Sequence, residues 1–191
     1  MEHSEKVRLF KHELDMIKSQ EIRDFVEEVF KYIPEHGFTT PASTSGKYHP
    51  RDERGHLGNV AHSKKVVRWT HIYAQAFEID DGLRLDILTA SAILHDLGRR
   101  GLGNSPSSHT LRAHASIMTG PLEKAQSEMK LDIRVFNTIK DCVRYHNGKW
   151  TEEEIRKPIA EYTRLELIIH LSDMAASKMH LIPSGEELMN E

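Results

Sequence analysis

The chain has 191 residues, a formal net charge of −3, 13 histidines and one cysteine. This length fits a single domain with a sizeable core, and the absence of net positive charge argues against a protein that binds duplex nucleic acid. A single cysteine excludes an internal disulfide, MEHSEKVRLF at the N-terminus has no apolar signal core, and no apolar run could span a bilayer. We therefore expect a soluble, cytoplasmic protein without a membrane partner.

Apolar residues recur at spacings of three and four through most of the chain, which predicts helices. Residues 3–33 predict an N-terminal helix that serves packing or dimerisation, so a homodimer is one expected partner. The segment 33–57 is rich in proline, glycine and serine and predicts a long irregular loop. A helix is expected over 58–77, and another over 83–97 is apolar on all sides, which places it at the centre.

Further helices are expected toward the C-terminus, with Gly120 and Pro121 ending the first of them. Their expected ranges are 109–119, 121–129, 132–145, 152–157 and 160–181. No alternating strand pattern stands out, so we expect an all-α fold in one domain. Residues 1–40 would form the N-terminal helix and linker, 41–182 the helical bundle, and 183–191 a polar tail.

Six histidine and aspartate side chains lie on otherwise apolar helix faces, and two of them end the most apolar helix, in the stretch ILHDLGRR. A buried carboxylate persists only when a hydrogen-bond network or a metal ion compensates its charge. A single inward histidine is usually a hydrogen-bonded core residue, but six such groups together favour a metal centre for Mn, Fe, Ni, Co or Zn. The six residues are His62, His95, Asp96, His114, His146 and Asp173.

The helix over 83–97 presents a difficulty for this hypothesis, because adjacent helical residues point about 100° apart. Gly98 offers a solution, since a glycine that ends the helix would let His95 and Asp96 converge on one point.

The order H…HD…D, read as His62, His95–Asp96 and Asp173, resembles the HD superfamily of metal-dependent phosphohydrolases over about residues 41–181. In that family the four groups hold a divalent metal inside a bundle of helices. The resemblance therefore implies an HD-domain helical bundle and a divalent transition metal as cofactor.

Two further segments, HASIMTG from His114 and YHNGKW around His146, resemble the additional histidine segments of the HD-GYP group. That resemblance implies a second ion on these two histidines, with Asp96 bridging both ions, so one or two ions are expected. The GYP tripeptide itself is absent, and a cyclic-di-GMP substrate is not implied. The segment PASTSGKYHPRDERGHLGNVAH is loosely similar to the HD domain of bacterial 3′–5′ exoribonucleases.

The expected activity is hydrolysis of a nucleotide phosphate ester by metal-bound hydroxide, with a small phosphorylated substrate. Asp96 and Arg99 are the expected catalytic residues. Three alternatives remain open: a phosphodiesterase on cyclic nucleotides or short oligonucleotides, a non-catalytic nucleotide-binding module, and, suggested only by the many histidines, a di-iron oxygenase.

Phosphate requires cations near the centre, and aromatic rings can hold a base. The expected phosphate- and substrate-binding residues are Lys47, Tyr48, Arg99, Arg100 and Lys149, with Lys178 and Trp150 as weaker candidates. His49 and His56 lie in the long loop, where histidines are mostly solvated, so we expect them to be exposed.

Overall fold

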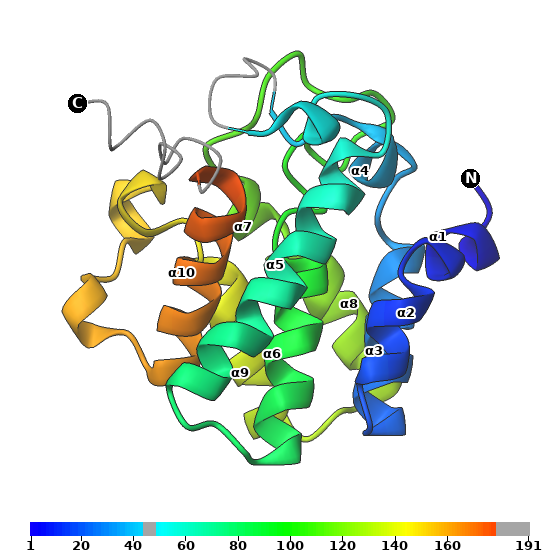
Figure 1. The fold of residues 1–191 in the computed structure, drawn as a ribbon. Helices are drawn as coiled ribbons and strands as arrows, with labels where there is room; N and C mark the ends of the chain where they lie inside the picture. Colours follow the sequence, from blue (N-terminus) through cyan, green and yellow to red (C-terminus); the bar gives the residue numbers. More distant parts are fainter. Residues whose placement is uncertain (44–48, 179–191) are drawn as a thin grey trace, which may run out of the picture.

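The computed structural model describes residues 1–43 and 49–178, and all regular structure in these ranges is helical (Figure 1). This confirms the predicted all-α class. The α-helices are α1 (His3–Leu9), α2 (Lys11–Met16), α3 (Gln20–Lys31), α4 (His36–Thr39), α5 (Gly58–Ala76), α6 (Gly82–Leu94), α7 (His114–Ile117), α8 (Thr119–Met129), α9 (Ile133–Tyr145) and α10 (Arg164–Lys178). Short 3-10 turns cover Arg51–Glu53, Gly148–Trp150, Glu153–Ile155 and Ile159–Glu161.

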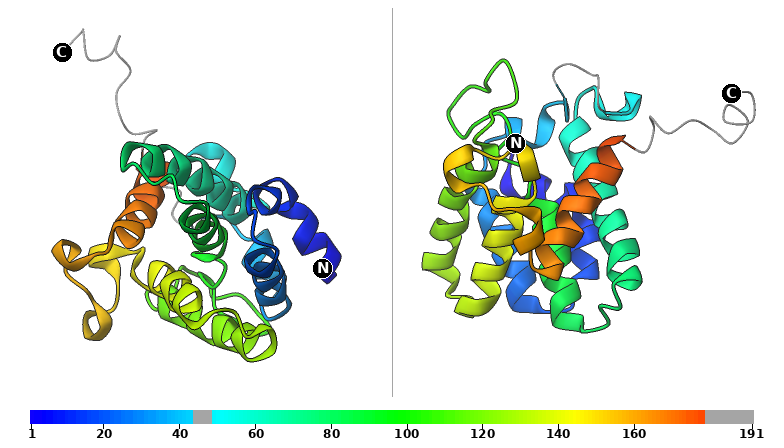
Figure 2. Two further views of the ribbon diagram at one scale, coloured as in Figure 1. Left: turned by 90° about the horizontal axis from the view of Figure 1, so that it is seen from below. Right: turned by 90° about the vertical axis from the view of Figure 1, so that its left-hand side faces the viewer.

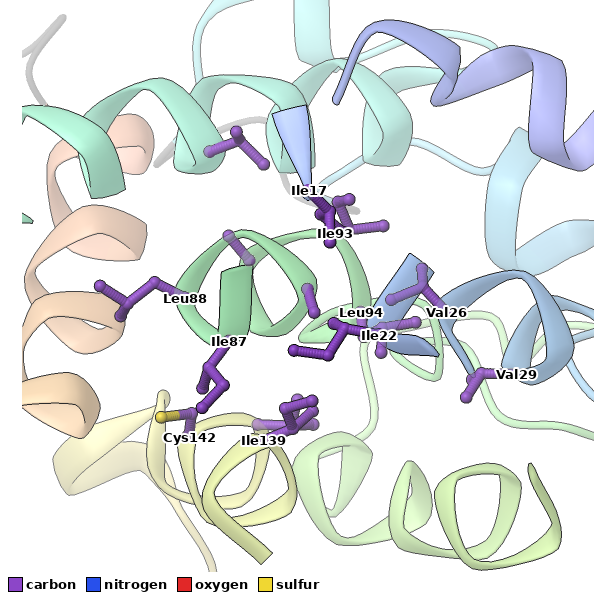
Figure 3. Close-up of a cluster of buried hydrophobic side chains, with 14 of the residues drawn as sticks. Ile17, Ile22, Val26, Val29, Ile87, Leu88, Ile93, Leu94, Ile139 and Cys142 are labelled. Atoms are coloured by element: carbon purple, nitrogen blue, oxygen red, sulfur yellow. The ribbon is translucent and has the colours of Figure 1, made fainter. Parts of the chain in front are cut away.

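Helix α6 occupies the centre of the bundle, as its apolar sequence predicts. The Asp81 side chain accepts hydrogen bonds from the amides of Leu83 and Arg84 and so caps its first turn. Every residue from Asp86 to Leu94 is buried. Helices α2, α3, α5, α9 and α10 pack around it, which the end-on view in Figure 2 shows. Figure 3 shows isoleucine, leucine and valine side chains of α3, α6 and α9 filling the space between them.

The expected single helix over 3–33 is wrong, because the structure has three helices there. The chain turns at Phe10 and again before Ser19, which caps α3. The carboxylate of Asp86 on α6 accepts hydrogen bonds from the amides of Lys18 and Ser19, at 2.9 and 2.7 Å. These amides would otherwise be unsatisfied where the helix breaks, so a buried carboxylate of the central helix stabilises the break.

Other boundaries also differ from expectation: the helix expected over 109–119 forms only as α7, and α4 lies within the expected loop over 33–57. Gly120 and Pro121 do not end a helix; they lie in the first turn of α8, where proline is tolerated because its missing N–H is not needed. The expected helices over 152–157 and 160–181 are 3-10 turns followed by α10. That helix begins late because Thr163 and Glu166 form a capping box, each accepting a hydrogen bond from the other's backbone amide.

Helix α5 begins, and helices α6, α9 and α10 end, at the same end of the bundle, drawn uppermost in Figure 1. The carbonyl ends of three helices therefore meet there, which favours positive charge nearby. None of the helices in the described ranges has the length and hydropathy that a bilayer crossing requires.

Candidate metal centre

Helix α6 ends at Leu94, three residues before the expected end, and Gly98 is not the residue that stops it. The amide of His95 still bonds to Ser91, but Leu97 and Arg99 bond to carbonyls only three residues back. The chain thus continues as consecutive tight turns. This local geometry brings the side chains of His95 and Asp96 to one point, with His95 Nε2 3.3 Å from Asp96 Oδ2.

The two carboxylate oxygens of Asp96 face two different groups of ligand atoms. Oδ2 lies 3.5 Å from His62 Nε2, on α5, and His62 Nε2 in turn lies 3.0 Å from Asp173 Oδ1, on α10. These two residues, His95 and Asp96 form one group whose ligand atoms all lie within 4.8 Å of one another.

The second group surrounds the other oxygen of Asp96. His114 Nε2 lies 3.1 Å and His146 Nε2 3.5 Å from Asp96 Oδ1, and the two histidine nitrogens are 3.2 Å apart. The structure therefore brings all six predicted ligand candidates together, from α5, α7, α10 and the turns after α6 and α9.

Three of the histidines are oriented by the same local hydrogen bond. The Nδ1–H groups of His95, His114 and His146 each donate to the carbonyl three residues earlier, at 2.8, 2.7 and 2.6 Å. This bond fixes the ring and leaves the Nε2 lone pair directed at Asp96, which is the tautomer a metal ligand requires.

His62 lies inside α5 and has no such carbonyl available, so a carboxylate takes that role. Its Nδ1 lies 3.2 Å from Glu53 Oε2, and the same oxygen lies 2.7 Å from His49 Nδ1. The other Glu53 oxygen lies 2.9 Å from Lys65 Nζ. Glu53 is fully buried and was not among the predicted site residues. The expectation that His49 is exposed is wrong, because this pairing buries it, whereas His56 is exposed as expected.

The electrostatics of the cluster keep its carboxylates charged. Burial opposes ionisation of Asp96, but Arg99 and the surrounding histidines hold its pKa well below the usual value. Burial likewise acts against the charge of His62, yet its bonds to Asp173 and Glu53 raise its pKa to about 9. An Asp96 held ionised in this way suits a ligand better than a proton acceptor.

Arg99 is buried and belongs to the centre, with its Nη2 2.7 Å from Asp96 Oδ2. Its Nη1 donates to the carbonyl of Ala42, so it ties the segment before α5 to the centre. Arg100 donates from Nε to the Ser107 carbonyl and holds the loop that follows. Lys149 is exposed beside Trp150. The candidates Lys47 and Tyr48 lie outside the described residues.

The residues present fit a divalent metal. Both oxygens of Asp96 and Nε2 of His95 are buried yet form no hydrogen bond of good geometry within the described part of the chain. Ligands 2.0–2.2 Å from one ion are about 2.8–3.6 Å apart at octahedral or tetrahedral angles. The distances given above fall in this range, whereas His95 Nε2 lies 4.0 Å from Asp173 Oδ1. Nitrogen and oxygen donors without thiolate favour Mn, Fe, Co, Ni or Zn.

A cavity of about 250 Å³ opens beside Asp173, whose side chain is 15% exposed and is the most accessible of the six. The cavity is lined by His49, Asn147, Trp150, Asp173, Met174 and Lys178. A substrate can therefore reach the cluster from this side.

Comparison with known protein families bears on this cluster. The HD domain family matches residues 59–176, the stretch that carries all six side chains. The chain belongs to the HD-domain family. It is thus a member of the HD superfamily of metal-dependent phosphohydrolases, as its H…HD…D pattern predicts. No solved structure matches the chain.

Curated relatives of this HD domain include 3′–5′ exoribonuclease YhaM of Bacillus velezensis, 29% identical over 128 residues. The YhaM proteins of Bacillus pumilus and Bacillus subtilis are 28% and 27% identical over the same length. In each case the alignment covers 64% of this chain and 40% of the relative, so the chain spans well under half of these proteins.

Proposed function

We propose that this HD domain hydrolyses a phosphate ester of a nucleotide at a centre of one or two divalent transition-metal ions. The observation that carries the proposal is the placement of Asp96, whose two oxygens face two separate sets of histidine nitrogens. When bound, divalent ions supply an acidified water and neutralise charge on the phosphoryl oxygens.

The side chains of the site have separate roles in this proposal. The six histidine and aspartate side chains would hold the metal, and Arg99 keeps Asp96 ionised and in place. Asp173 marks the side from which substrate approaches, because it combines contact with His62 and exposure to the cavity. Lys149 and Lys178 lie near that opening and provide positive charge toward a phosphate.

A second candidate is cleavage of phosphodiester bonds at the end of a short oligonucleotide. The observation that favours it is the similarity to the YhaM exoribonucleases, although these are much longer than this chain. A net charge of −3 gives no general attraction for a long polynucleotide, which favours the monoester.

The test is hydrolysis by the protein reconstituted separately with Mn, Fe, Co, Ni and Zn. Nucleoside mono- and triphosphates, cyclic nucleotides and short oligoribonucleotides serve as substrates, with products identified by mass spectrometry. Release of phosphate or pyrophosphate from mononucleotides is the expected result. Cleavage of diesters alone would replace the proposal by the second candidate. Metal binding without any turnover would indicate a nucleotide-binding module instead.

A further inference from the structure

The wall of the cavity beside Asp173 includes an exposed indole and Lys178, and a second lysine, Lys149, lies beside the indole; the metal cluster does not use these groups. We propose that it is a nucleoside subsite, in which the base of one nucleotide unit stacks on Trp150 and its phosphate lies between Lys178 and the metal centre. This inference rests on the proposed function and names the part of the substrate that the site recognises.

Trp150 is held in position relative to the centre by a short rigid connection. It lies four residues after His146, in the 3-10 turn Gly148–Trp150. Gly148 has φ +57°, and a Cβ there would lie 2.4 Å from Cε1 of His170. His170 Nδ1–H donates to the carbonyl of His146 at 2.6 Å, so the turn is packed directly against the segment that carries a ligand.

The indole is also unusually accessible. The Trp150 residue is 42% exposed, whereas every other Phe, Tyr or Trp ring in the described ranges is buried or partly buried. An exposed aromatic ring at the mouth of a cavity offers a stacking face, and such stacking accepts any base.

Two lysines lie over the same ring. Lys178 Nζ is 4.4 Å and Lys149 Nζ 4.8 Å from the centroid of the Trp150 ring. Neither forms an ion pair with any described carboxylate. Their long side chains can leave the ring when a base stacks there, and their charges then lie where a phosphate enters.

The remaining walls and the size agree with one nucleoside. Met174 supplies a deformable apolar surface. The side-chain amide of Asn147 makes no hydrogen bond to any described residue, so it is available to bind the edge of a base. A volume of about 250 Å³ lies near the lower limit of ligand pockets, about 300 Å³. It suits a single nucleotide unit rather than a dinucleotide.

The chain offers a matched control, because its second tryptophan, Trp69, lies on α5 and packs against Tyr73. In a Trp69→Phe protein, Trp150 is the only tryptophan and reports directly on the cavity. The metal-loaded, full-length chain is titrated with each of the four ribonucleosides, which carry no phosphate ester and are not hydrolysed. Ribose is the control for the sugar, and inorganic phosphate is the probe for the charge.

We expect ribonucleosides, but not ribose, to quench the fluorescence of Trp150. By calorimetry, Trp150→Leu should weaken nucleoside binding about 5- to 150-fold, the equivalent of one lost stacking contact, while Trp69→Leu leaves it unchanged. Lys178→Ala should weaken binding of inorganic phosphate several-fold without weakening nucleoside binding, because the lysine competes with the base for the indole face.

Nucleoside binding that is equal in wild type and Trp150→Leu would overturn the subsite, whichever ester the enzyme hydrolyses. So would hydrolysis of phosphate esters by a protein that binds no nucleoside. Quenching by nucleosides in a protein that hydrolyses no ester would retain the subsite and reject the hydrolase function. The two proposals therefore fail separately.

Discussion

Glu53 contacts His62 on the side of the ring opposite Asp173, with Oε2 3.2 Å from Nδ1. This carboxylate does for His62 what backbone carbonyls do for the other three histidines: it fixes the ring and directs Nε2 inward. Glu53 is therefore a positioning residue of the proposed metal centre.

Substitution Glu53→Gln should weaken metal binding about 10- to 100-fold, because an amide orients and polarises His62 less effectively than a carboxylate. Competition with a chromophoric chelator measures this affinity. Glu166→Gln changes an equally buried carboxylate, which pairs with Lys157 away from the centre, and should leave the affinity unchanged. Equal affinity of wild type and Glu53→Gln would contradict the assigned role.

The substitution Asp96→Asn should reduce turnover by about 10³-fold or more. It removes the one charged group shared by both ligand sets. Loss of several kcal/mol of transition-state stabilisation lowers the rate by about this factor. Steady-state rates and metal content by mass spectrometry check the prediction, and helical circular dichroism shows that the fold persists. Undiminished turnover in a folded Asp96→Asn protein would rule out the centre as the catalytic site.

The two histidine sets should be separable by metal stoichiometry. In His114→Gln we expect one ion fewer than in wild type, since only the group around Asp96 Oδ1 is altered. His62→Gln should instead reduce metal binding by the group around Asp96 Oδ2. Identical metal content in wild type and His114→Gln would show that this histidine holds no second ion.

Stability of the chelated protein should depend on pH through His62. Its folded pKa of about 9 exceeds the ordinary value of 6.5, so protonated His62 stabilises the fold fully below pH 6.5. That contribution, on the order of 3 kcal/mol, is lost as pH rises through 9. Urea unfolding in chelator at pH 6 to 9.5 measures it. Asp173→Asn removes the strongest partner of the imidazolium and should flatten the dependence. His62→Gln should abolish it, and an equally steep dependence in that variant would exclude His62 as its source.

Arg99→Ala should destabilise the chelated protein by about 3–5 kcal/mol, because it leaves the buried Asp96 charge without its arginine. Metal should reduce this loss by supplying positive charge to the same carboxylate. Arg100→Ala removes one hydrogen bond to the Ser107 carbonyl. It should lower the free energy of unfolding by about 1 kcal/mol, by the same amount with and without metal. Chemical unfolding with and without metal distinguishes the two variants.

The sequence allowed prediction of the helical class, the central helix and the six clustered side chains, because each rests on local periodicity or on a family pattern. The break before Ser19 could not be predicted, since the carboxylate that stabilises it, Asp86, comes from a distant part of the chain. Glu53 was missed for a similar reason. Its spacing of four from His49 is a weak signal in a segment rich in proline and glycine, and only the tertiary fold brings it to His62.

The residues matched by the HD family begin at 59, whereas Glu53 and His49 precede that boundary. Arg99 contacts the segment before α5 through the Ala42 carbonyl. This segment therefore carries Glu53, a residue that orients a proposed ligand but lies outside the ligand pattern. Changes within residues 49–53 can therefore alter the orientation of His62, and with it metal affinity, while every proposed ligand stays in place. The group that orients His62 and the groups proposed to bind metal thus lie in separate parts of the chain.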